Sequence, residues 1–153
     1  MADNIQLNSG SGGSIAAADD VSSVYYQRVK IVPGGDGVVA NSGCTNYSYL
    51  AAASTNQDSQ VPKASAGVLY GLTVTNSNTS ARYLKVYNKA SSPTSGDTPY
   101  RRYLIPAGGG VREQFPFGLN FDTGIAFRLV TGAADNDATA VAAAEILLNL
   151  EYV

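Results

Sequence analysis

Two stretches of alternating residues in the middle of the chain constrain the fold most strongly. In residues 68–75 every second side chain is large and apolar. Neighbouring side chains of a strand point to opposite faces, so this pattern predicts a strand with one apolar face. Residues 82–89 alternate in the same way, and the intervening residues 76–80 are of turn-forming types. The two stretches together predict a β-hairpin.

Several other segments are also expected to be strands. They are rich in β-branched and aromatic residues and are separated by clusters of Pro and Gly. These segments are residues 24–32, 45–53, 100–105, 111–117 and 125–131.

The C-terminal stretch has two competing interpretations. Residues 138–150 are full of Ala, Leu and Glu, and intrinsic propensity alone favours a helix there. However, Ile146, Leu148 and Leu150 fall on one side of an extended chain and Asn149 falls on the other. We therefore favour a final strand. About eight short strands without a long helix predict an all-β fold, an antiparallel β-sandwich of the jelly-roll kind.

The N-terminal residues differ in composition from the rest of the 153-residue chain. Residues 1–23 are rich in Gly, Ser, Ala and Asn, which favours an extended N-terminal arm, and residues 24–153 are expected to form a single β-sandwich domain. We expect the arm to be dispensable for folding and to bind a partner. The likeliest contact residues lie at the junction: Tyr25, Gln27, Arg28 and Lys30. In the alternative interpretation, this junction is an integral strand of the sheet.

Catalytic and metal-binding chemistry is restricted by residues that the chain lacks. It has no histidine, which excludes a Ser-His-Asp triad and a His-ligated zinc. The single Cys44 cannot form an internal disulfide, and we expect it to be a small buried filler. Residues 135–137 resemble the start of a calcium loop but lack its Gly and Glu, so a polar loop tip is expected. We predict no metal and no cofactor. An enzyme would have to depend on carboxylates alone.

The charge of the chain favours protein partners. Charged residues make up only 14% of the sequence and the net charge is −2, which disfavours nucleic acid as a partner. We also expect no membrane span and no secretion signal, and hence a product of the cytoplasm. A weakly charged polar surface suits repeated protein contacts. The ten tyrosines fit either such contacts or half-buried packing in strands.

A set of short motifs runs through the chain. In the N-terminal part they are AADD at 17–20, VYYQRVK at 24–30 and GDG at 35–37, and residues 69–76, 82–88 and 124–126 add to them further along. Together these motifs resemble those of small virion structural proteins of tailed bacteriophages, and the likeness covers most of the chain. The family pattern often has Ile-Gly-Gly after the paired aspartates, where this chain has residues 21–23 as Val-Ser-Ser.

The resemblance implies a non-enzymatic component of the virion, made in the host cytoplasm. A capsid decoration or cement protein is the first role that it suggests. The partners would then be the major capsid protein or neighbouring virion proteins, and by analogy the chain would be a homo-oligomer, namely a trimer. The alternative is a tail- or fibre-associated adaptor or receptor-binding module.

Overall fold

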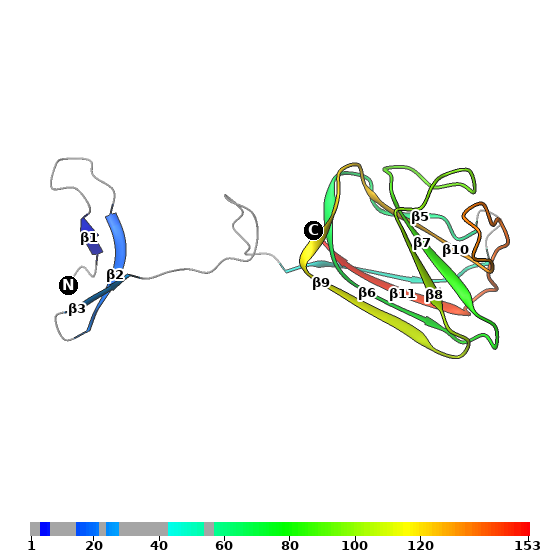
Figure 1. Cartoon of the computed structure of the whole chain (residues 1–153), viewed down its shortest axis with the longest axis horizontal. Coiled ribbons are helices and arrows are strands. Elements are labelled where there is room, and N and C mark those ends of the chain that lie inside the picture. The colour runs from blue at the N-terminus through cyan, green and yellow to red at the C-terminus, as the bar shows by residue number, and fades with distance from the viewer. Residues whose placement is uncertain (1–3, 7–14, 22–23, 28–42, 54–56) are drawn as a thin grey trace. The chain divides into compact units, whose positions relative to one another are not determined.

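The computed structural model describes residues 4–6, 15–21, 24–27, 43–53 and 57–153, and side chains from residue 43 onward. The chain divides into two compact units, Met1–Ala40 and Asn41–Val153. Every regular element in the described residues is a β-strand, so the predicted all-β class is confirmed. Each unit is described by itself below (Figure 1).

The first unit contains a small antiparallel sheet in the order β1-β2-β3, formed by Asn4–Gln6, Ile15–Val21 and Val24–Gln27. Strand β3 pairs with β2, with Tyr25 opposite Asp20. The boundary predicted between residues 23 and 24 lies between these two paired strands, and it stays a prediction. That residues 1–23 act as a dispensable arm stays a prediction.

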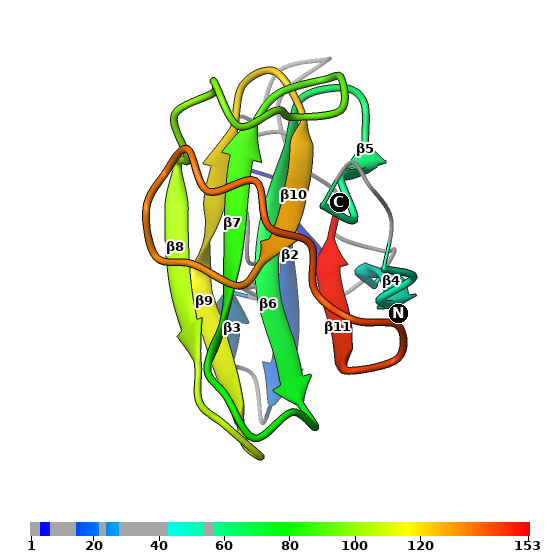
Figure 2. The ribbon, with the colours of Figure 1, turned by 90° about the vertical axis from the view of Figure 1, so that its right-hand side faces the viewer.

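The second unit contains eight strands in two antiparallel sheets of four. One sheet has the order β4-β11-β6-β9, formed by Thr45–Leu50, Ile146–Tyr152, Gly67–Asn76 and Gly110–Phe121. The other has the order β5-β10-β7-β8, formed by Gln60–Lys63, Ile125–Val130, Arg82–Asn88 and Arg101–Ile105. Figure 2 shows strands of both sheets running alongside one another.

One hydrophobic cluster joins the two sheets. Leu72 and Leu148 contribute from the first sheet, and Leu84 and Phe127 contribute from the second. The ring of Tyr49 in β4 meets the ring of Phe127 edge to face, with centroids 5.4 Å apart. Burial of apolar side chains from both sheets in one core gives the second unit a sandwich-like architecture.

The predicted hairpin between residues 68–75 and 82–89 is wrong, although both segments are strands. Strand β6 pairs with β9 and β11, whereas β7 pairs with β8 and β10 in the other sheet. The buried side chain of Asn76 redirects the chain, because its Nδ2 donates to the carbonyls of Ser80 (2.9 Å) and Pro106 (3.1 Å). The backbone of Ser77 donates to Glu145 O (2.8 Å) instead of closing a turn. The intervening residues are thus a crossover between sheets.

The expected final strand is confirmed. In β11, Ile146, Leu148 and Leu150 are buried, and Leu147 and Glu151 are exposed. Alternation therefore outweighs the helix propensity of the Ala-rich sequence, because the apolar row of β11 completes the core between β4 and β6.

Removal of residues 1–40 is expected to leave the stability of the second unit almost unchanged. The hydrophobic cluster runs from Ala51 to Tyr152 and lies wholly in the second unit. A chain that begins at Asn41 should therefore unfold with a free energy within about 0.5 kcal/mol of the full-length value. Urea unfolding followed by circular dichroism measures this, and a loss several times larger would show that the first unit belongs to the folding core.

Candidate contact surface

The two sheets of the second unit differ in what covers the face that points away from the core. On the β4-β11-β6-β9 sheet these outward side chains reach solvent, and we call this surface the open face. It consists of Asn46, Ser48, Leu50, Thr73, Thr75, Arg112, Gln114, Leu147, Asn149 and Glu151. All are exposed except Asn149, which is half-buried.

The open face is nearly uncharged and has an apolar pair at one end. Arg112 and Glu151 are its charged members. Leu50 and Leu147 are register partners on β4 and β11, and they are 54% and 40% exposed. Long charged side chains resist dehydration, so a flat surface with few of them loses its water at lower cost when it meets another protein.

The corresponding face of the β5-β10-β7-β8 sheet is covered by loops. Lys85 in β7 and Arg128 in β10 are register partners and are both fully buried. The loop that follows β10 lies over them, and Figure 2 shows this segment crossing the sheet. Lys85 Nζ donates to the carbonyls of Ala134 and Asp135 in that loop. Burial lowers the pKa of Lys85, and the nearby negative charge of Asp137 opposes this effect.

Arg128 connects three separate loops to the covered face. Its Nη1 donates to Thr94 O (3.0 Å) and to the hydroxyl of Tyr87 (3.2 Å). Its Nη2 donates to Gln57 Oε1 (2.8 Å) and to Asp137 O (2.9 Å). A buried cation requires such acceptors, so Arg128 fixes loops from three parts of the sequence on this side of the sandwich.

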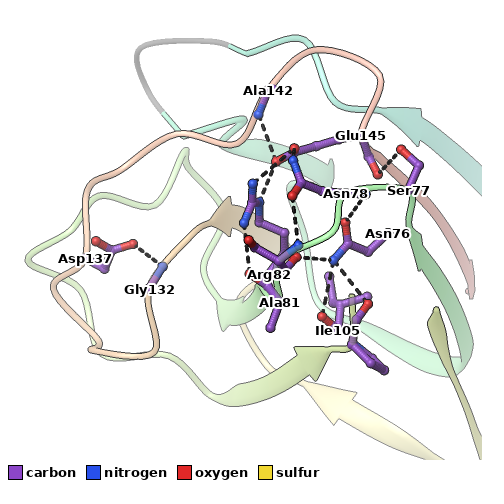
Figure 3. Close-up of polar contacts among 12 residues, drawn as sticks. Asn76, Ser77, Asn78, Ala81, Arg82, Ile105, Gly132, Asp137, Ala142 and Glu145 are labelled. Carbon is purple, nitrogen blue, oxygen red and sulfur yellow. Dashed lines mark hydrogen bonds and ion pairs between the residues drawn. The ribbon is translucent and has the colours of Figure 1, made fainter. Parts of the chain in front are cut away.

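A second buried polar cluster fastens the β6–β7 crossover to the segment before β11 (Figure 3). Glu145 accepts hydrogen bonds from Arg82 Nε (2.6 Å), Asn78 Nδ2 (2.6 Å) and the backbone of Ala142 (2.9 Å). The Arg82 and Glu145 side chains are only 13% and 6% exposed. Burial raises the pKa of Glu145, but the bonds from Arg82, Ala142 and Asn78 outweigh it and hold the pKa below its ordinary value.

Asp97 gives the β7–β8 loop a dependence on pH. Its carboxylate accepts from Lys89 Nζ (2.6 Å) and from the backbone of Thr94 (2.7 Å), and these bonds lower its pKa from 3.8 to about 2. A depressed carboxyl pKa stabilises the fold above the unfolded-state pKa, and this contribution is lost as the pH falls towards 2. Because the pair is partly exposed, we expect about 0.5 kcal/mol.

The Asp97→Asn variant tests this contribution. Its free energy of unfolding should lie about 0.5 kcal/mol below that of the parent at pH 6, and the difference should vanish near pH 2. Chemical unfolding at a series of pH values measures it. A difference that persists at pH 2 would assign the effect to something other than the charge of Asp97.

An irregularity in the edge strand β9 presents an aromatic side chain to solvent. Gln114 is the register partner of Gly71 and Leu119 is that of Leu69, so residues 115–118 bulge out opposite the single Tyr70. Phe117 lies in this bulge and is 99% exposed. Bulges are frequent at sheet edges, where they re-aim side chains.

The predicted contact residues all belong to the first unit, whereas the open face belongs to the second. Tyr25 and Gln27 lie in β3 of the first unit, and Arg28 and Lys30 lie outside the described residues. The expectation that Cys44 is buried is wrong, since this residue precedes β4 and is exposed.

The sequence analysis missed the residues that distinguish the two faces. Alternation along β7 and β10 does not reveal that loops cover the outer face of one sheet, so it did not identify Lys85 and Arg128 as buried cations. Phe117 was placed at the end of an ordinary strand. The sequence does contain a signal for its bulge, since Pro116 and Gly118 flank it and both residues disfavour regular strand pairing.

The polar tip predicted for residues 135–137 is present in the β10–β11 connection. Asp135 pairs with Arg102, and Asp137 accepts from the backbone of Gly132 (2.7 Å). Within the described residues, no group of three potential ligands is arranged to hold a metal ion. In the same part of the chain, no helix is long and apolar enough to cross a membrane.

Comparison with known proteins identified no relative of the chain. No family model matches the chain, and neither a curated protein nor a solved structure matches it.

Proposed function

We propose that the chain is a non-enzymatic structural protein of a bacteriophage virion, a capsid decoration or cement protein whose partner is the major capsid protein. The observation that carries the proposal is the contrast between the two outer faces. Loops anchored by Arg128 and Lys85 cover one face, while the other is nearly uncharged and open. A sandwich built in this way has one side suited to lie against another protein.

We infer further that the sandwich is a jelly roll. The pairs β4–β11, β5–β10, β6–β9 and β7–β8 join each strand of the first half to its mirror strand in the second half. This is the pattern of one long hairpin wound into two sheets, and jelly rolls are common in viral capsid proteins. The strand order and the sequence resemblance thus support the same class of protein independently.

The proposed mechanism of stabilisation is multiplication of small contacts. Each copy would bridge neighbouring capsid subunits through its open face, and assembly as a homo-oligomer, proposed by analogy to be a trimer, would let several copies engage at once. Once one copy of an oligomer is bound, the other copies are held at a high effective concentration near their sites. A weak contact per copy is therefore enough for the oligomer to bind the capsid tightly. The buried carboxylates Glu145 and Asp58 accept hydrogen bonds from loop groups, which supports a structural role for them rather than a catalytic one.

Quantitative mass spectrometry of purified virions tests the proposal. A cement protein should be present in hundreds of copies per particle. A few copies would contradict the cement role and favour the tail- or fibre-associated alternative, and complete absence would contradict a virion role. The variant Leu147→Glu on the open face should lower the copy number. Its matched control is Leu104→Glu, which alters a leucine of β8 that is 54% exposed.

A further inference from the structure

The bulge of β9 holds Phe117 in a defined position. Phe115 and Leu119, on either side, pack against the hydrophobic core. Gly118 has a φ of +74°, and a Cβ at this position would lie 2.2 Å from Cγ1 of Val68. The backbone is therefore pressed against β6, and a side chain other than glycine would push it away. The neighbours of Phe117 thus hold the backbone of the bulge in place, while the Phe117 side chain itself is exposed.

Exposure of Phe117 is unfavourable for the isolated protein. Full burial of a phenylalanine side chain stabilises a protein by roughly 2–3 kcal/mol, and at 99% exposure none of this is gained. Leucines on the same surface keep about half of their area covered, which distinguishes Phe117 from an ordinary exposed apolar residue. The side chain of phenylalanine has only two rotatable bonds, so a ring held on a fixed backbone loses little conformational entropy when it is bound and is suited to be an anchor.

The surroundings of Phe117 favour a protein as its partner. Next to the bulge lie the polar, uncharged side chains of Gln114, Asn120 and Tyr70. The strand β9 carries one basic and one acidic residue, Arg112 and Glu113, so it has no net charge. Binding to an anionic membrane or to a nucleic acid would require several basic residues around the ring, which β9 does not provide. An apolar centre with a polar, uncharged rim is the usual composition of an interface between proteins.

We propose that Phe117 is the principal anchor of the contact and inserts into an apolar pocket of the partner protein. This inference rests on the proposed function, in which the partner is the major capsid protein. Phe117 lies on β9, the edge strand of the sheet that carries the open face, so the anchor and the open face can belong to one continuous interface. The Phe117 side chain would supply most of the binding energy, as a hot-spot residue does. The open face would exclude water from the contact around Phe117.

The test compares Phe117→Ser with Leu104→Ser in the full-length chain. Capsid particles that lack the protein are titrated with each purified variant, and bound copies are counted by mass spectrometry. Loss of a hot-spot side chain is expected to weaken binding about 30-fold, whereas Leu104→Ser should bind as the parent does. Thermal unfolding of Phe117→Ser should match that of the parent, because the ring has no intramolecular contact to lose.

Each outcome has a defined meaning. Equal binding of Phe117→Ser and the parent would overturn the anchor while leaving the proposed function intact. Failure of the parent itself to bind particles would instead overturn the proposed function. As a second readout, a photo-cross-linking phenylalanine analogue at position 117 should label the major capsid protein. Exclusive labelling of a second copy of the chain would also overturn the proposal. So would unfolding of the Phe117→Ser variant, because the loss of binding would then follow from the loss of the fold.

Discussion

Replacement of Arg128 by methionine is expected to lower the free energy of unfolding by about 3–5 kcal/mol. Methionine approximates the length of the arginine stem but cannot donate hydrogen bonds. The carbonyls of Thr94 and Asp137 and the amide oxygen of Gln57 would then lose the donor that fixes their loops. A buried acceptor left without its donor costs about 1–3 kcal/mol. These three acceptors are only partly buried, but three loops are affected together.

The matched control for this prediction is Arg112→Met on the open face. Arg112 is exposed in β9, so its replacement should change the free energy of unfolding by no more than about 0.5 kcal/mol. Urea unfolding of both variants, followed by far-ultraviolet circular dichroism, measures the difference. Equal stability of the two variants would show that Arg128 does not hold the loops on the covered face.

The Glu145→Gln variant should have an effect of similar size, about 3 kcal/mol or more. Glutamine keeps the shape of the side chain but removes its charge, so the guanidinium of Arg82 would remain mostly buried without a counter-ion. The new amide group would also face Asn78 Nδ2, which is itself a donor. The connection between the β6–β7 crossover and the residues before β11 would therefore weaken.

A double-mutant cycle with Arg82→Met isolates this ion pair. If Arg82 and Glu145 stabilise the fold through each other, the double variant should be less destabilised than the sum of the two single variants. Glu151→Gln is the control, because Glu151 is a glutamate of β11 that is exposed on the open face. Additive effects of Arg82→Met and Glu145→Gln would contradict the coupling.

Local patterns in the sequence identified most strands of the second unit but not their partners. The alternation in residues 68–75 and 82–89 correctly marked β6 and β7, because one face of each strand lies in the core. Which strands pair depends on contacts between distant residues, such as Leu72 with Leu150, and local periodicity contains no information about them. The turn-like residues between the two strands were therefore predicted to form a hairpin turn. In the structure they cross from one sheet to the other, and the side chain of Asn76 holds this crossover through its bonds to the carbonyls of Ser80 and Pro106.

The contact surface could be predicted less well than the fold. Composition indicated a weakly charged surface, and the open face has that character. The sequence did not show which sheet is covered, because Lys85 and Arg128 bind loop groups that are mostly far from them in the chain, such as Asp135 for Lys85 and Gln57 for Arg128. The exposure of Phe117 likewise depends on a register shift between β6 and β9, which only the paired strands reveal.

A cryo-electron-microscopy reconstruction of the virion tests the central claim most directly. The account predicts density for the second unit at many equivalent positions on the outer shell, with the open face and Phe117 against the major capsid protein and the Lys85 and Arg128 side directed away from it. Density confined to the tail, or a sandwich whose loop-covered face lies against the shell, would contradict the account.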